Sequence, residues 1–429
     1  MHATPAQRLG WYFWLLLIIL SPANTKLAGA AWVLAIVSSF WLAYRYPKLP
    51  AESAATLALY RATHIILWSV LIAFVLRTIG QAYWWDNWTY RHFDVRMVFT
   101  AIALHIVVRR FTLPEPMRIE LLIAIALASL SALYVTYPYL QYIHEPDVPT
   151  SIIPWAFAMV LFSMVLASQR TLPHPSTGKA RFVLNAVTTV GAILFLVAII
   201  IAGVRGAYFG IAWVLIVIAL GLKHTLPLKH LKGKSFWLSC LGIFVFVGIV
   251  VTNVPQLYDI PQKRITKALN EIKDFKANDR GTSVGLRLHF LEKGVDSFVK
   301  HPWLGVGIEK RIELVEQWTI EAKFPFRDMT HTHNEYLNSI LDYGILGGVA
   351  TLAYLLGILL AASILFRTNF PLSLTLAGFF FAILTTFFTN TNTAHNYTSV
   401  SLGLALMYSI LLYSNRQRRH PHQQQKPER

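Results

Sequence analysis

The chain is poor in charge and nearly free of cysteine. Charged residues make up 14% of its 429 residues and hydrophobic residues 55%, whereas soluble domains carry roughly a quarter charged residues. This composition excludes an ordinary soluble protein. The single cysteine, Cys240, excludes an intrachain disulfide. The sequence also has no P-loop, no Asp-x-Asp motif and no internal repeat, so nothing favours a nucleotide-dependent enzyme or a repeat-built transporter.

The chain is rich in long apolar runs, each of roughly the length that a helix needs to cross a hydrocarbon core. The sequence therefore predicts an all-α, polytopic membrane protein with about twelve transmembrane helices. No convincing signal-peptide cleavage site follows the first run, which is predicted to remain as a span. The expected spans are 9–22, 27–44, 57–79, 94–108, 117–136, 151–169, 182–203, 207–222, 235–253, 343–366, 371–390 and 397–414.

The net charge of +17 is interpreted as a topology signal and not as a nucleic-acid-binding surface. Lys and Arg gather in alternate loops and in the C-terminal tail, whereas the loop 137–150 has neither. Because cytoplasmic loops are enriched in Lys and Arg, both termini are predicted to be cytoplasmic. The expected parts are a transmembrane bundle over 1–253, an external loop domain over 254–342, three further spans over 343–414 and a cytoplasmic tail over 415–429.

The external segment 254–342 has mixed, nearly balanced charges and is predicted to fold. Apolar residues at helical spacing predict two amphipathic helices, the second ending at His301-Pro302, and a third helix that begins near His333. The residues that set this spacing are Ile265, Ala268, Leu269, Ile272 and Phe275 in the first helix and Leu286, Phe290 and Phe298 in the second.

His333 is the strongest candidate for catalysis. At a helix N-terminus the dipole disfavours the imidazolium ion, and a neutral imidazole near pH 7 is what a general base needs. Asn334 and Tyr336 could orient this histidine or bind a sugar hydroxyl. The alternative is a surface histidine that only caps the helix. His331 and His333 could also hold a metal, although no third ligand is obvious nearby.

Two arginines are candidates for binding an anionic ligand. Arg205 stands between glycines in Gly203-Val204-Arg205-Gly206, where a lipid-facing charge would cost roughly 2.5–3.5 kcal/mol. Arg287 stands among apolar neighbours in the second external helix. A guanidinium is well suited to phosphate or pyrophosphate. The alternatives are an interfacial arginine at 205 and an ordinary solvated one at 287.

Several polar residues near the spans fit more than one role or have no assigned role. Arg61, His64 and Arg77 lie in or near the third span and could pair inside the bundle or touch a lipid headgroup. Asp94 begins the fourth span, and His395-Asn396 repeats the earlier His-Asn pair before the last one.

With these residues in view, the chain resembles the O-antigen ligase (WaaL) branch of the O-antigen ligase and polymerase superfamily. The family signature is His, then Asn, Ser or Gln, nine residues and Gly-x-x-Gly; here it reads His333, Asn334, nine residues, Gly344 and Gly347. The family's Arg-Gly pair matches Arg205-Gly206. Its arginine ahead of a Pro-x-x-Gly-x-Gly turn matches Arg287, with the turn at 302–307.

The resemblance implies a GT-C-like enzyme of the bacterial inner membrane with its active site on the periplasmic side. It would move a glycan en bloc from undecaprenyl pyrophosphate to lipid A–core in lipopolysaccharide biosynthesis, by an inverting reaction that uses no metal and no cofactor. His333 would be the catalytic base. Arg205 and Arg287 would bind the pyrophosphate, and membrane lipids would surround the bundle.

Three alternative functions compete with that of an O-antigen ligase. A polymerase of the same superfamily uses the same donor with a second lipid-linked glycan as acceptor, but more often has two sizeable periplasmic loops. A protein O-oligosaccharyltransferase is typically longer. A lipid-linked glycan flippase or transporter would belong to another class, and a large external helical domain with a His-Asn pair is not typical of one.

Overall fold

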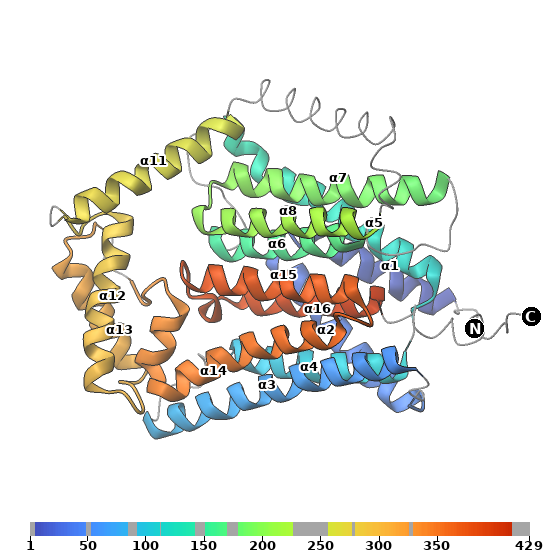
Figure 1. The fold of residues 1–429 in the computed structure, drawn as a ribbon, viewed down its shortest axis with the longest axis horizontal. Coiled ribbons are helices and arrows are strands. Elements are labelled where there is room, and N and C mark those ends of the chain that lie inside the picture. The colour runs from blue at the N-terminus through green and yellow to red at the C-terminus, as the bar shows by residue number, and fades with distance from the viewer. Residues whose placement is uncertain are drawn as a thin grey trace, which may run out of the picture.

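The protein is all-helical in the part of the chain that the structure, a computed structural model, describes. No strand occurs there, and the helices are the fourteen labelled α1–α8 and α11–α16 (Figure 1). The described residues are 5–48, 53–84, 92–111, 113–141, 151–169, 179–225, 256–276, 279–325 and 329–413.

Helices occupy all the predicted spans except 235–253, which lies outside the described residues. The first eight helices are α1 (Pro5–Leu20), α2 (Thr25–Arg45), α3 (Ala54–Trp84), α4 (His92–Arg110), α5 (Glu115–Gln141), α6 (Ile152–Ser168), α7 (Lys179–Ala202) and α8 (Arg205–Thr225). The C-terminal part of the bundle contains α14 (Glu335–Leu365), α15 (Phe370–Phe387), the short 3₁₀ helix η3 (Asn392–Ala394) and α16 (Asn396–Tyr413).

Two helices form the centre of this bundle. In α6 every residue from Pro154 to Ser168 is buried, and in α16 every residue from Tyr397 to Tyr413 is buried. A helix that is apolar and buried all round belongs inside a bundle or a membrane. A buried hydrogen bond from the Tyr413 hydroxyl to Ser168 Oγ (2.7 Å) joins the two helices.

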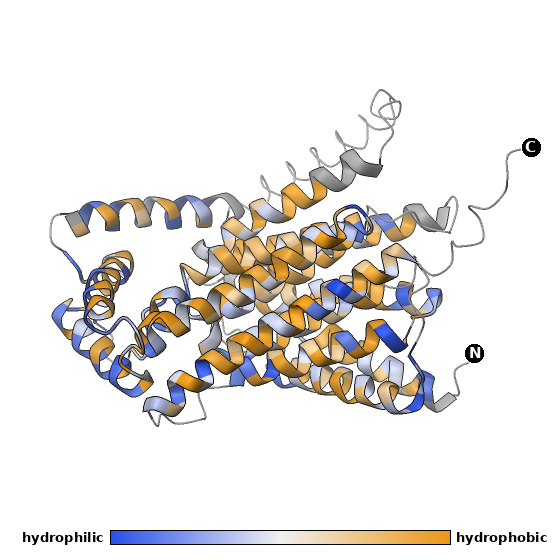
Figure 2. Ribbon diagram, turned by 60° about the horizontal axis from the view of Figure 1, so that its bottom comes forward, coloured by the Kyte–Doolittle hydropathy of each residue, from blue (hydrophilic) through white to orange (hydrophobic). Residues whose placement is uncertain are grey.

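The outer helices present apolar side chains outward, as a lipid-facing surface requires. Six helices among the described residues are long and apolar enough to cross a membrane, and three shorter apolar helices accompany them. On α14 the exposed side chains form one stripe, whereas Ala350, Tyr354 and Ala361 on the opposite face are buried. Figure 2 shows the apolar colour concentrated over the bundle. The stripe consists of Ile345, Val349, Leu352, Leu356 and Leu360.

Three helices lie beyond one end of the bundle (Figure 1), opposite the end where α1 begins and α16 finishes. They are α11 (Gln256–Lys276), α12 (Ser283–Lys300) and α13 (Ile308–Glu321). The sequence predicted the first two, and α12 ends at Lys300 as expected, but α13 was missed. The three predicted apolar residues Ile265, Leu269 and Ile272 of α11 are 51%, 56% and 39% exposed.

A small second hydrophobic core holds α12 and α13 against the start of α14. We call it the outer core; it consists of Leu286, Phe290, Val315, Trp318, Ala322, Leu337 and Leu341. Phe290 and Val315 are fully buried. Because α14 contributes to the outer core and then continues into the bundle, it fixes α12 and α13 relative to the spans.

Candidate functional site

The loop before α14 carries the predicted catalytic histidine. Asn334 is the N-cap of α14, and its Oδ1 accepts a hydrogen bond from Leu337 N (3.1 Å). His333 precedes the cap, with a left-handed φ of 54°. The sequence placed the start of the helix near His333; the helix begins at Glu335 because asparagine is a strong N-cap residue. A positive φ is rare outside glycine and persists only where the surroundings fix it.

Hydrogen bonds on both sides fix this loop. The Asn338 Oδ1 accepts from Thr332 N (3.0 Å) and from Thr332 Oγ1 (2.7 Å), and the Asn338 Nδ2 donates to Thr391 Oγ1 (3.3 Å). Arg311 of α13 donates to the Thr330 carbonyl, and its Nε donates to Asp342 Oδ1 at 2.5 Å. The loop is therefore tied to α13, to α14 and to the connection between α15 and α16.

Three imidazoles meet at this loop. The rings of His331 and His333 are nearly perpendicular, with centroids 4.3 Å apart, and the His395 ring lies 6.0 Å from that of His331. The Nδ1 atoms of His331 and His333 are buried and have no hydrogen-bond partner among the described residues. A buried polar atom left unpaired costs about 1–3 kcal/mol. These unpaired nitrogens make both imidazoles candidates to bind a hydroxyl or another polar ligand group.

Both histidines of the loop are held in their neutral form. Burial is the main cause that lowers the pKa of His333 to about 3, and the neighbouring His331 and the charge of Arg287 lower it further. Burial likewise lowers the pKa of His331 to about 4. A hydrogen bond with Asn390 acts in the opposite direction on His333. The sequence predicted a neutral His333 from the helix dipole, and the physical cause here is burial with neighbouring positive charge.

Arg287 of α12 lies close enough to act electrostatically on this cluster, since its charge lowers the pKa of both His331 and His333. Arg205 is the first residue of α8. Its backbone lies beside the same region, because a Cβ at Gly206 would collide with Thr389 Oγ1. Thr389 precedes Asn390, the hydrogen-bond partner of His333. Two predicted anion-binding positions therefore converge on the histidine loop from different helices.

The side chain of Tyr336 contacts α15 and the residue that follows it. Its hydroxyl donates to the Leu384 carbonyl (3.1 Å), and its ring packs against Phe388 with centroids 4.7 Å apart. These contacts anchor α14 to α15. The Asn334 oxygen is likewise occupied by the helix cap. Substrate binding by these two residues stays a prediction, and their observed contacts are structural.

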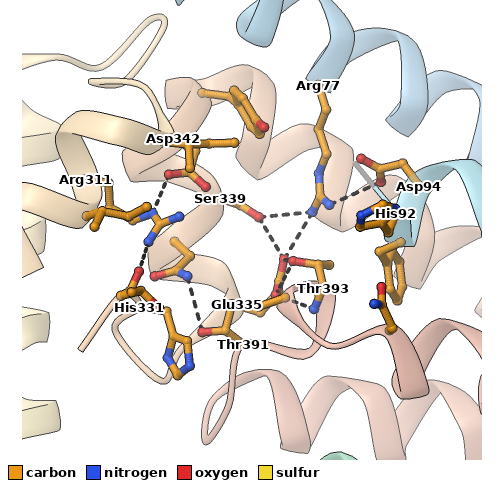
Figure 3. Close-up of a pocket in the computed structure, with 18 residues that line it drawn as sticks. Arg77, His92, Asp94, Arg311, His331, Glu335, Ser339, Asp342, Thr391 and Thr393 are labelled. Carbon is orange, nitrogen blue, oxygen red and sulfur yellow. Dashed lines mark hydrogen bonds and ion pairs between the residues drawn. The ribbon is translucent and has the colours of Figure 1, made fainter. Parts of the chain in front are cut away.

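A polar cavity of about 280 Å³ opens beside the loop, between α13, the start of α14 and the α15–α16 connection (Figure 3). His331 lines it, and the His333 ring, which is not part of the lining, has its centroid 4.3 Å from that of His331. The lining includes cations, carboxylates and hydroxyls, a mixture suited to a polyhydroxylated ligand. These residues are Arg77, His92, Asp94, Arg311, His331, Glu335, Ser339, Asp342, Thr391, Thr393 and Asn396, with seven further neighbours.

A buried ionic network forms the far wall of the cavity. Arg77 of α3 lies 3.3 Å from Asp94 Oδ1 of α4 and 3.3 Å from Glu335 Oε1 of α14. Glu335 in turn accepts hydrogen bonds from Thr393 N (3.0 Å) and Thr393 Oγ1 (2.7 Å). Figure 3 shows this chain of contacts. One carboxylate therefore holds the segment that carries His395 against α3 and α14.

The glycines after the histidine shape the helix and not the chemistry. Gly344 has φ 59° and ψ −142°, which breaks α14 inside its length. The turn at 302–307 docks on this break through hydrogen bonds from Val306 N to the Leu341 carbonyl (2.7 Å) and from Ile345 N to the Pro302 carbonyl (2.8 Å). A Cβ at Gly347 would collide with the Ser339 carbonyl. Both glycines are thus required for α14 to fold back on itself.

Residues 190–352 match the family model described as O-antigen ligase (Wzy_C). The matched range contains Arg205, Arg287, His333 and both glycines of the break. This segment is an O-antigen ligase domain. Membership of the O-antigen ligase superfamily, predicted from the motif spacing, is thereby confirmed for it. No curated protein matches the chain.

The site also uses residues on either side of the O-antigen ligase domain. Arg77 and Asp94 precede it, and Thr393 and His395 follow it. Sequence reasoning left Arg77, Asp94 and His395 without a role and missed Arg311, Glu335, Asp342 and Thr393. One signal was available: Glu335, Ser339 and Asp342 recur at helical spacing and form a polar face on α14. No group of three or more His, Cys, Asp and Glu among the described residues has the arrangement to hold a metal ion.

Proposed function

We propose that the protein is an O-antigen ligase, an inverting glycosyltransferase that moves a glycan from undecaprenyl pyrophosphate to a sugar hydroxyl of lipid A–core. The observation that carries this proposal is the pair of buried, neutral imidazoles with unpaired Nδ1 atoms, beside a polar cavity, within an O-antigen ligase domain. The family is one of glycosyltransferase-like enzymes.

His333 acts as the general base. An acceptor hydroxyl that hydrogen-bonds to its imidazole gives up its proton as the oxygen attacks the anomeric carbon of the donor. The new bond joins the acceptor oxygen to that carbon, and the bond from the carbon to the pyrophosphate oxygen breaks. A pKa of about 3 keeps the base free of protons at neutral pH, although it also makes the base weak. Binding of the anionic pyrophosphate beside it would raise that pKa toward the useful range.

The departing pyrophosphate is held by Arg287 and Arg205. Arg287 carries its charge within electrostatic reach of His333, and Arg205 opens α8, whose N-terminal N–H groups favour an anion. Positive groups placed where charge develops lower the barrier, and losing one such donor typically costs about 10²–10³ in turnover. The acceptor sugar occupies the cavity lined by His331, Asp342 and Thr391.

The enzyme lies in the bacterial inner membrane with α11–α13 and the histidine loop on the periplasmic side. Lys and Arg support this orientation, because α2 ends at Arg45 and α4 ends at Arg109 and Arg110, at the bundle end away from the loop. Excess Lys and Arg mark the cytoplasmic side. Both termini are then cytoplasmic, as the sequence predicts.

The test uses the purified full chain in proteoliposomes with an undecaprenyl-pyrophosphate-linked glycan and rough lipopolysaccharide, with and without EDTA. We expect glycan to appear on lipid A–core, with EDTA making no difference. A donor glycan that grows longer, with nothing transferred to lipid A–core, would establish a polymerase instead. Movement of intact donor across the bilayer without transfer would point to a flippase.

A further inference from the structure

A second cluster of basic side chains lies at the other end of the bundle, where α3 begins and α4 ends (Figure 1). The rings of His64 and His105 are 5.5 Å apart, and the Arg109 guanidinium carbon lies 5.4 Å from the centre of the Tyr60 ring. Lys48 also acts electrostatically on His105. We call His64, His105, Arg109 and Lys48, together with Arg61, the basic end cluster.

No carboxylate neutralises this cluster in the described residues, because none of the ion pairs found there involves its members. Two of its buried nitrogens, His105 Nδ1 and Arg109 Nε, have no hydrogen-bond partner there either. The two residues are four apart on α4 and so share one face. Buried polar atoms are almost always paired, so two unpaired nitrogens on one helix face, together with positive charge, mark a place for an anion.

The cluster opens toward lipid along α3. Leu57, Arg61, His64, Trp68 and Ile72 recur at helical spacing, and all of them except His64 and Arg61 are apolar. Trp68 is 54% and Ile72 48% exposed. The Trp68 Nε1 donates to His64 Nε2 (2.7 Å), so neutral His64 carries its proton on Nδ1 and is a donor there. Exposed apolar side chains beside these donors suit an acyl chain next to an anionic headgroup.

The depth of the cluster fits a headgroup. α3 has 31 residues and is about 46 Å long, which exceeds the roughly 30 Å hydrocarbon core. His64 lies about 15 Å from the start of α3 and His105 about 8 Å from the end of α4 at the helical rise. Both positions are near the boundary between hydrocarbon and headgroups, where tryptophan is also enriched.

We infer that the basic end cluster binds the phosphodiester of an anionic phospholipid, with Arg109 and His105 as ligands and Trp68 against the acyl chains. Basic pockets between spans on the cytoplasmic side are known to bind anionic headgroups. The bound lipid would join α3 to α4 at the end opposite to Arg77 and Asp94, which join the same two helices at the cavity. This inference shares the membrane orientation of the proposed function but does not depend on glycan transfer.

The test is native mass spectrometry of the delipidated full chain titrated with dioleoyl phosphatidylglycerol, dioleoyl phosphatidylcholine or inorganic phosphate. We expect one phosphatidylglycerol to bind with the highest affinity and phosphatidylcholine about tenfold more weakly. We expect Arg109→Gln and His105→Gln each to weaken phosphatidylglycerol binding about tenfold. Arg367→Gln is the matched control, because Arg367 is exposed at the same end of the bundle, and it should change nothing.

Three results would overturn the inference. One is equal affinity for phosphatidylglycerol and phosphatidylcholine in the unaltered protein, which needs no variant to fold. Another is unchanged phosphatidylglycerol binding by both cluster variants. The third is binding of inorganic phosphate with an affinity equal to that of phosphatidylglycerol in the same titration, which would assign the cluster to a free anion and not to a lipid.

Discussion

Removing the charge of Arg77 should destabilise the protein strongly. Its side chain is 5% exposed and lies between Asp94 and Glu335, whose side chains are 4% and 1% exposed. It also donates to Ser339 Oγ (3.1 Å) and Thr351 Oγ1 (3.0 Å). Arg77→Met would leave two buried carboxylates without their cation, and such a loss costs about 3–5 kcal/mol.

The expected loss lies near the lower end of this range because both carboxylates keep other donors. Asp94 accepts from the Tyr354 hydroxyl (2.7 Å), and Glu335 accepts from Thr393. We therefore expect Arg77→Met to lower the free energy of unfolding by about 3 kcal/mol and Arg77→Lys by about 1–2 kcal/mol. Arg367→Gln, at an exposed position, should change it by less than about 0.5 kcal/mol.

The measurement is equilibrium unfolding by sodium dodecyl sulfate in mixed micelles, followed by tryptophan fluorescence. A loss for Arg77→Met below about 1 kcal/mol, the net worth of a single ordinary hydrogen bond, would refute the reasoning. The charge would then not be needed to hold α3, α4 and α14 together.

Three further changes test separate parts of the site. Gly347→Ala should lower the free energy of unfolding by about 2 kcal/mol or more. Gly348→Ala is the control and should change it by less than about 1 kcal/mol, because a Cβ there meets only the Ile340 side chain, at 3.2 Å. Equal losses would contradict the close approach at Gly347. Tyr336→Phe should cost about 1 kcal/mol of stability and leave glycan transfer by the folded protein within about twofold, whereas a large rise in KM would restore Tyr336 as a substrate ligand. The folded pKa values of about 3 for His333 and about 4 for His331 lie below the unfolded value of roughly 6.5. Between the folded and unfolded pKa values the unfolded chain binds more protons than the folded chain. The free energy of unfolding therefore falls as the pH drops below about 6.5. The double variant His331→Gln/His333→Gln should flatten this fall in a pH series of unfolding free energies, and an unchanged slope would show that the two imidazoles are not buried in neutral form.

Much of the fold could be predicted because each span corresponds to one continuous run of apolar residues in the sequence. Continuous apolar runs placed helices at the predicted spans within the described residues, and His301-Pro302 marked the end of α12. The predicted span that begins at 343 starts next to the break in α14 at Gly344. The predicted third external helix, which begins near His333, agrees with this break, because Gly344 has non-helical φ and ψ between the helical segments on either side of it.

The wall of the cavity could not be predicted in the same way. Arg77 contacts Glu335 across 258 positions, and Thr393 contacts Glu335 across 58. A single sequence shows the type and local spacing of residues but not which distant pairs meet. The motif located His333 and the two arginines, whereas the partners that hold the histidine loop became visible only once the helices were packed together.

The most direct test of the proposed chemistry is the initial rate of glycan transfer to lipid A–core by His333→Gln, measured in proteoliposomes with matched amounts of folded protein. The control is His301→Gln, because His301 is exposed in the same part of the chain. Loss of a general base typically costs about 10²–10⁴ in rate. We expect a loss of this size for His333→Gln and a rate within about twofold of the unaltered protein for the control. A rate for His333→Gln within about threefold of the unaltered protein would contradict the assignment of His333 as the base.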